Sequence, residues 1–148
     1  MIDAAIAVLG ARMKVVARSA TRNTPPMGPA GRSFANAAVV IATGLEPLAL
    51  LVRLKQIERD FGRGRGRRWG PRVLDLDILL WSGGPFRAGT RVSPLSIPHS
   101  GIATRDFVLR PLLEIVPDWR HPVLGVNVRQ LRTRLHRATP VDRSRRHP

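Results

Sequence analysis

Asp75 and Asp77 are the residues of this sequence whose type and spacing best suit metal chemistry. They stand in VLDLDILL (residues 73–80), where apolar side chains occupy the alternate positions. Successive side chains of a strand point to opposite faces, so we expect both carboxylates on one face and the apolar residues in the core. Converging carboxylates repel each other unless a cation or a proton lies between them, and Mg²⁺ prefers carboxylate and phosphate oxygens. The pair predicts a metal and phosphate site; an ordinary solvent-facing strand edge is the alternative for the motif alone.

Arginines gather just before these acids. Residues 62–72 contain five arginines and no acidic residue, and Trp69 stands among them. A guanidinium group donates paired hydrogen bonds to phosphate oxygens, and an indole ring offers a flat face on which a base or a guanidinium stacks. This neighbourhood favours the metal and phosphate interpretation over the strand edge.

His99, in the sequence SIPHS, precedes Arg105 by six residues. We expect the imidazole and the guanidinium to complete a phosphate clamp, while a purely structural role is the common alternative for a lone histidine. His121, His136 and His147 do not stand in a comparable motif, so we assign them no role in the site.

Phe34 and Asn36 share one face of a predicted strand, by the same alternation rule. An asparagine side chain both donates and accepts hydrogen bonds, and a phenyl ring stacks, so the pair suits a planar, hydrogen-bonding ring. The preceding loop NTPPMGP (residues 23–29) has its backbone set by prolines and could present amide and carbonyl groups to the same ring. The alternatives are an Asn36 that is buried and satisfied by backbone, and an inert surface loop.

The composition indicates one globular domain. The chain has 148 residues, of which 43% are hydrophobic and 24% charged, and this excludes collagen-like, coiled-coil and wholly disordered classes. No cysteine is present, which excludes disulfide frameworks and thiolate metal sites and favours a reducing, cytoplasmic location. The longest apolar run is too short to cross a bilayer, so we expect no membrane partner.

The net charge of +15 must be matched by an anionic partner, for which phosphate is the obvious candidate, or tolerated as self-repulsion. Most of the excess lies in the arginine-rich segment 62–72 and in the tail, residues 129–148. We expect one basic loop and one basic tail on a nearly neutral body.

Hydrophobic periodicity and the placement of glycine and proline predict the elements that must position these residues. We expect helices at residues 2–12, 47–61, 110–115 and 126–135, strands at 14–21, 33–43 and 72–81, and irregular connections at 23–32, 62–71 and 82–94. This order is typical of an α+β fold with an antiparallel sheet.

Three groups of motifs resemble one family. They are RWGPRVLDLDILLW (residues 68–81), TPPMGP with FANAAV (24–29 and 34–39), and LSIPHSGIATRDFVLRPLLEIVPDW (95–119). Over residues 2–119 the chain resembles hydroxymethyldihydropterin pyrophosphokinase of folate biosynthesis. The resemblance implies a ferredoxin-like antiparallel sheet with helices packed on one face. It also implies transfer of pyrophosphate from ATP to the hydroxymethyl group of 6-hydroxymethyl-7,8-dihydropterin, release of AMP, and two Mg²⁺ ions.

The resemblance also implies a role for each site residue. Asp75 and Asp77 would hold both metal ions. The triphosphate would contact Arg72, His99 and Arg105, and the loop that closes over ATP would carry Arg63 and Arg65. The pterin pocket would be lined by Thr24, Pro25, Met27, Phe34, Asn36 and Phe107, with Trp69 closing it and Ile78 beside the adenine. Lys55 replaces a residue that is often an amide near ATP.

The family normally begins with a strand that ends in a Gly-Ser-Asn turn, whereas this chain begins inside the helix that follows. We therefore expect the N-terminal strand to be absent and its neighbours to lack pairing, with a loss of stability. We expect a pyrophosphokinase domain at residues 1–125 and a basic helix and tail at 126–148, the tail being dispensable for chemistry.

Two other functions remain open from the sequence. GRGRGRRWG (residues 62–70) resembles arginine-glycine segments that bind RNA. The DLDIL motif argues against this, because an RNA-binding protein gains nothing from two acids beside its basic loop. The second alternative is an inactive, truncated remnant of the pyrophosphokinase fold. We expect a monomer that acts on ATP and a reduced pterin, with no nucleic-acid partner.

Overall fold

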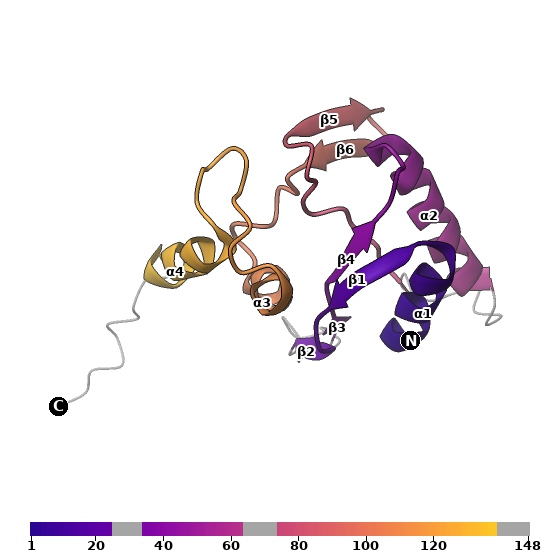
Figure 1. Cartoon of the computed structure of the whole chain (residues 1–148), viewed down its shortest axis with the longest axis horizontal. Coiled ribbons are helices and arrows are strands. Elements are labelled where there is room, and N and C mark those ends of the chain that lie inside the picture. Colours follow the sequence, from indigo (N-terminus) through magenta and orange to yellow (C-terminus); the bar gives the residue numbers. More distant parts are fainter. Residues whose placement is uncertain (25–33, 64–73, 139–148) are drawn as a thin grey trace.

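The computed structural model of the chain describes residues 1–24, 34–63 and 74–138 (Figure 1). In chain order its elements are α1 (Ile2–Arg12), β1 (Lys14–Arg18), β2 (Arg22–Thr24), β3 (Phe34–Asn36), β4 (Val39–Ala42), α2 (Pro47–Arg63), β5 (Phe86–Gly89), β6 (Pro94–Ile97), α3 (Asp106–Ile115) and α4 (Val128–Ala138). The predicted helix at residues 2–12 is confirmed at both ends. None of the helices in these ranges is long and apolar enough to span a membrane.

All the strand pairs in the described part of the chain are antiparallel. β1 pairs with β4, β2 with β3, and β5 with β6. In the first pair Lys14 lies opposite Ala42 and Arg18 opposite Val39. The α+β class with antiparallel pairing is therefore confirmed.

The first core lies between α1, α2 and the β1–β4 pair. Its buried residues are Ala5, Leu9, Leu54, Ile57 and Leu74. In α2, apolar residues recur three or four positions apart, as expected for one buried face of a helix. Figure 1 shows α1 and α2 together on the same side of β1 and β4. Leu74, from the segment that carries the two aspartates, packs in the same core, so this segment lies beside α2.

The second core holds α3 against α4. Its buried residues are Ala38, Ile102, Leu109, Leu112, Val128 and Leu131. Leu109 and Leu112 lie three residues apart in α3, as do Val128 and Leu131 in α4, so each helix turns one stripe toward the other. In Figure 1 these two helices lie on the other side of β1 and β4 from α1 and α2.

The strand predicted at residues 72–81 is wrong for its described part, since residues 74–81 join no strand ladder. We call residues 74–80 the acid segment. Its backbone bonds to other groups: the Leu76 N–H donates to Oε1 of Glu58 over 2.7 Å, and the Leu79 carbonyl accepts from the His99 N–H over 3.0 Å. A strand requires a neighbouring strand to complete its hydrogen bonds, and here a side chain and a loop take that place.

Other boundaries also differ from the predictions. The strand predicted at 33–43 is divided into β3 and β4, because the Ala38 N–H donates to the buried hydroxyl of Ser19 over 2.9 Å instead of continuing a ladder. The connection predicted at 82–94 contains the β5 strand of a hairpin with β6, and Gly89 takes a φ of 94° where the hairpin turns.

The two C-terminal helices are confirmed, with shifted ends. α3 begins at Asp106, a full turn before the predicted start. α4 ends at Ala138, beyond the predicted end at residue 135. Most of the predicted loops at 23–32 and 62–71, and the end of the tail, lie outside the described residues.

Candidate active site

The acid segment turns its carboxylates outward. Asp75 and Asp77 are exposed, whereas Leu74 is buried and Leu76 and Ile78 are partly buried against the first core. The alternation predicted from the sequence therefore holds although no strand ladder forms. Both acids are presented at the surface by residues that the core holds in place.

Glu58 anchors the acid segment to α2. One of its carboxylate oxygens accepts the Leu76 N–H, and both accept from the Lys55 ammonium group over 3.2 and 3.3 Å. The Glu58 side chain is only 13% exposed. Leu76 lies between the two aspartates, so Glu58 fixes the backbone at the centre of the acid pair. Sequence reasoning missed Glu58; the available signal was an acid three residues after Lys55 on a polar stripe of α2.

His99 faces Asp77 with a defined ring orientation. Its Nδ1 accepts the Gly101 N–H over 3.0 Å, so in the neutral imidazole the proton lies on Nε2. That nitrogen is 3.8 Å from Oδ2 of Asp77, whose side chain is 52% exposed. This separation exceeds a hydrogen bond but allows charge attraction when the imidazole is protonated. Two residues that were assigned to the site from separate motifs are thus brought together.

Gly101 and Phe107 set the course of the Arg105 side chain. A Cβ at Gly101 would lie 3.0 Å from Cδ and Nε of Arg105, so a larger residue there would push this side chain aside by a few tenths of an ångström. The Arg105 Cζ lies 6.0 Å from the centre of the Phe107 ring, within reach of a cation–π contact. His99, Gly101 and Arg105 form one local unit, of which sequence reasoning had found the first and last members.

A cleft of about 600 Å³ opens between α2, the acid segment and β6. Its lining includes Lys55, Glu58, Asp77, Ile78, Pro94 and His99. Clefts that enclose small ligands and cofactors usually measure about 300 to 1,000 Å³. Ile78 supplies an apolar wall, whereas Lys55 and His99 offer donors, so the cleft suits a ligand with a flat apolar part and an anionic part.

Thr24, Phe34 and Asn36 meet on the β2–β3 pair. The Asn36 amide nitrogen donates to the Thr24 hydroxyl over 2.8 Å, and Thr24 lies directly opposite Phe34 in the ladder. Phe34 is 61% exposed, which is unusual for so large an apolar side chain. Asn36 thus bonds to a side chain, where backbone partners were the alternative, and an exposed phenyl ring lies nearby.

Several predicted site residues are not described by the structure. Pro25, Met27, Arg65, Trp69 and Arg72 lie outside the described residues, and Arg63 is known only as the last residue of α2. Within the described ranges, no group of three or more histidines and acids is arranged to hold a metal ion. The two-aspartate metal site therefore stays a prediction.

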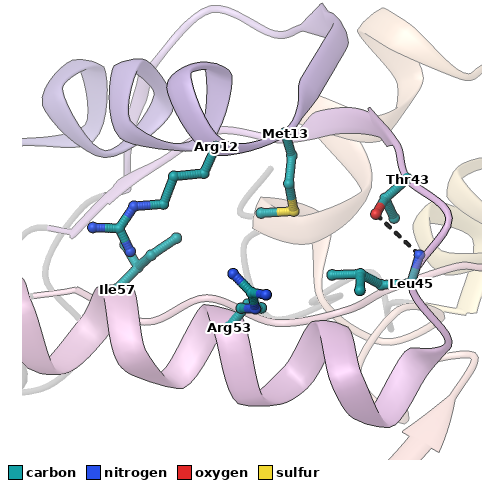
Figure 2. A pocket seen from close by; sticks show the side chains of 6 residues that line it. All are labelled: Arg12, Met13, Thr43, Leu45, Arg53 and Ile57. Carbon is teal, nitrogen blue, oxygen red and sulfur yellow. Dashed lines mark hydrogen bonds between the residues drawn. The ribbon is translucent and has the colours of Figure 1, made fainter.

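A second, smaller cavity of about 210 Å³ lies between the end of α1 and α2 (Figure 2). It is lined by Arg12, Met13, Thr43, Leu45, Arg53 and Ile57, and Thr43 Oγ1 accepts the Leu45 N–H over 3.2 Å. Arg53 and Ile57 project from the side of α2 opposite to Lys55 and Glu58, by the 100° rotation per helical residue. This cavity contains none of the predicted site residues, so the larger cleft is the candidate site.

Comparisons with known proteins agree on one family. The model of a family described as 7,8-dihydro-6-hydroxymethylpterin-pyrophosphokinase (HPPK) matches residues 1–117. A 2-amino-4-hydroxy-6-hydroxymethyldihydropteridine pyrophosphokinase of Methylorubrum extorquens is 48% identical over 107 residues, covering 72% of this chain and 65% of that protein. Proteins of the same name from Pseudomonas aeruginosa and Synechocystis are 42% and 40% identical, over 74% and 70% of this chain. The matches cover 65% and 51% of those two proteins, so the chain spans about half to two thirds of these relatives.

Proposed function

The chain belongs to the HPPK family, and on this premise we propose that it transfers the β,γ-pyrophosphoryl group of ATP to a reduced hydroxymethylpterin. The pterin hydroxyl oxygen attacks the β-phosphorus, the bond from that phosphorus to the α,β-bridging oxygen breaks, and AMP leaves. The hydroxyl proton is released in the same exchange. The names of the relatives support this choice of substrates, and the absence of cysteine supports a cytoplasmic location for the chain, which we take to act as a monomer.

We assign the metal to the acid segment. Asp75 and Asp77 present hard oxygen donors at an exposed edge, and Asp77 also lines the cleft, so the donor set fits Mg²⁺ better than a softer metal. When bound, Mg²⁺ supplies charge neutralisation at the triphosphate oxygens. Glu58 and the Leu76 N–H then keep the two carboxylates on one side of the segment.

The protein groups around the cleft divide the substrates between them. His99 and Arg105 bind phosphate oxygens, and Ile78 packs on the adenine. Thr24, Phe34 and Asn36, together with Phe107, bind the pterin ring by stacking and by donor and acceptor contacts. Because the reaction needs no covalent intermediate with the protein, its rate depends on holding the hydroxyl and the β-phosphorus in line.

The residues outside the described ranges complete the proposal. Arg72 would bind the triphosphate with Arg105, Pro25 and Met27 would line the pterin pocket, and Trp69 would close it. Arg63 and Arg65 would carry the positive charge of the loop that covers ATP. These roles come from the family motifs.

One observation carries the proposal: Asp77 and His99 face each other and both line a cleft whose volume of about 600 Å³ suits a small ligand or cofactor. They are separated by 22 positions in the sequence, and the contact between Leu79 and His99 brings their segments together. An arginine-glycine RNA-binding protein has no use for this arrangement.

Product analysis tests the function directly. The purified chain is incubated with Mg²⁺, ATP and 6-hydroxymethyl-7,8-dihydropterin, and nucleotides and pterins are separated by chromatography. We expect AMP and the pterin diphosphate in equal amounts, and neither product when the pterin is left out. Formation of ADP would indicate transfer of a single phosphoryl group, and absence of both products would contradict the proposal.

A further inference from the structure

Asp106 is the first residue of α3 and stands between two residues of the candidate site, Arg105 and Phe107. Its Oδ1 accepts a hydrogen bond from Nε of Arg132 over 3.1 Å. The same oxygen lies 3.2 Å from Nε2 of His136, which donates to it, since an ionised carboxylate only accepts. Arg132 and His136 lie one turn apart in α4, so two successive turns of this helix bind the first residue of α3.

The first turn of α3 is closed by backbone hydrogen bonds, without a side-chain cap. Arg105 precedes the helix with extended φ and ψ of −120° and 107°, and no side chain caps the first turn. The Val108 and Leu109 N–H groups close that turn on the Arg105 carbonyl, over 3.0 and 3.2 Å. The conformation of Arg105 therefore depends on where the first helical residue is held.

The charges at this helix start favour the contact. Burial opposes ionisation of Asp106, but the hydrogen bonds from His136 and Arg132 outweigh it and lower the pKa of Asp106 below its usual value. A carboxylate in the first turn also interacts favourably with the helix dipole. The side chains of Arg132 and Asp106 are 31% and 40% exposed, so the pair is partly shielded from solvent.

We propose that Asp106, Arg132 and His136 form a clamp by which α4 positions Arg105 and Phe107 for their ligands. The proposal rests on the function given above, in which Arg105 binds phosphate and Phe107 binds the pterin. Arg132 and His136 lie beyond residue 117, where the family match ends, and they are positioning residues because they act through α3. A shift of Asp106 moves the side chains on both sides of it, since all three share one backbone.

The structure supplies a matched control for this clamp. Arg129, also on α4, donates from Nε to Oδ1 of Asp118 over 3.2 Å, the same chemistry at a similar distance. Asp118 lies after the C-terminal end of α3, away from Arg105 and Phe107. Removing this second pair weakens a contact of α4 without touching the start of α3.

Kinetics of full-length variants test the clamp. For Asp106→Asn and Arg132→Ala we expect about a tenfold fall in kcat/KM, mainly through higher KM for both substrates, because small misplacements of binding groups reduce rates strongly. Arg129→Ala should keep wild-type kinetics, although its melting temperature should be comparable to that of Arg132→Ala. Arg132→Lys, which retains a charged donor, should recover part of the loss. Equal losses in Arg129→Ala, or wild-type kinetics in Asp106→Asn and Arg132→Ala, would overturn the proposal.

Amide hydrogen exchange separates the clamp from the proposed activity. Asp106→Asn should speed exchange at Val108 and Leu109 several-fold and leave Val116, at the far end of α3, unchanged. Arg129→Ala should not speed exchange at Val108 or Leu109. Unchanged exchange at these amides in Asp106→Asn would refute the clamp whatever reaction the chain performs. If exchange responds as expected but the wild-type chain makes no AMP, the clamp on α3 stands and the assigned reaction fails.

Discussion

The two cores hold the two halves of the candidate site in different ways. Around the first core, the acid segment is tied down by Glu58, whose side chain is only 13% exposed. Around the second core, the start of α3 is held by Arg132 and His136, which are 31% and 57% exposed. The hydrogen bond from a backbone N–H to a shielded carboxylate is costly to break, whereas ion pairs that are only partly shielded are weakened by solvent and salt. We therefore expect the metal half of the site to be rigid and the arginine and aromatic half to be adjustable.

Removing an acid should have the largest effect on the first half. Asp77→Ala, and likewise Asp75→Ala, should lower turnover roughly a thousandfold, because each removes a proposed ligand of Mg²⁺, the ion that would neutralise charge on the reacting phosphates. The fold should be retained, since both residues are exposed. Asp60→Asn is the control, because Asp60 is an exposed acid of α2 paired with Arg12 at 3.5 Å. Near wild-type turnover of Asp77→Ala at saturating Mg²⁺ would contradict the metal assignment.

Matched cavities in the two cores would sharpen the comparison. Ile57 and Leu109 are both fully buried, one in each core. Ile57→Ala and Leu109→Ala should each lower the free energy of unfolding by about 3 kcal/mol. Ile57→Ala should mainly weaken binding of Mg·ATP, and Leu109→Ala binding of a pterin analogue. Urea unfolding and calorimetric titration measure both effects, with Val52→Ala, 65% exposed, as the control.

If both variants lose both ligands to the same extent, the two halves do not act separately and the contrast fails.

Loosening the anchor of the acid segment should have a moderate effect. Glu58→Ala leaves the Leu76 N–H without its acceptor, a change that costs about 1 to 3 kcal/mol. The loss should appear as weaker binding of Mg²⁺ and ATP, measured by titration. Glu58→Gln keeps an oxygen acceptor but not the charge. Its affinity for Mg²⁺ and ATP should therefore lie between those of the wild type and Glu58→Ala. Glu46→Gln, at an exposed acid just before α2, should change nothing, and equal loss in that variant would argue against a special role for Glu58.

Low pH should destabilise only the half of the protein that contains α3 and α4. We expect this to be the smallest of the four effects. Burial lowers the pKa of His121, whose Nδ1 accepts the N–H groups of Val123 and Leu124 over 3.2 and 3.0 Å. The unfolded chain then binds a proton more readily than the folded chain, so stability falls as the pH drops through the ordinary histidine pKa. At low pH the amides of the α3–α4 half should lose protection relative to their intrinsic exchange rates, while those of α1 and α2 keep theirs. A His121→Asn variant should lose this dependence; an unchanged pH response would assign it to another group.

The sequence predicted the elements with strong periodicity and the residues with local partners. Helix α1, the apolar face of α2 and the exposure of both aspartates followed from spacing alone, because helical and alternating patterns depend on neighbours in the chain. The Glu58 bond to Leu76, the passage of Arg105 over Gly101 and the clamp on Asp106 were not predictable, because each joins elements whose docking no local pattern describes. His136 has no obvious partner among its neighbours in the sequence, and in the fold it contacts Asp106, which is 30 positions away.

The strand wrongly predicted at residues 72–81 shows the same difference between what local patterns determine and what contacts between distant elements determine. Alternation correctly predicted which side chains face the core, but not which groups complete the backbone hydrogen bonds. A strand and the acid segment share a period of two residues, and only the tertiary partners distinguish them.

The acid segment also constrains how its length can vary. Its residues reach both cores: Leu74, Leu76 and Ile78 pack on the first, and Leu79 and Leu80 on the second. Inserting or deleting a single residue between Leu74 and Ile78 would turn the carboxylates toward the first core and the apolar side chains toward solvent. A two-residue change would restore the facing but would displace Leu79 and Leu80 from the second core. We therefore expect length changes to be poorly tolerated in this stretch, and insertions to accumulate in exposed loops away from the cleft.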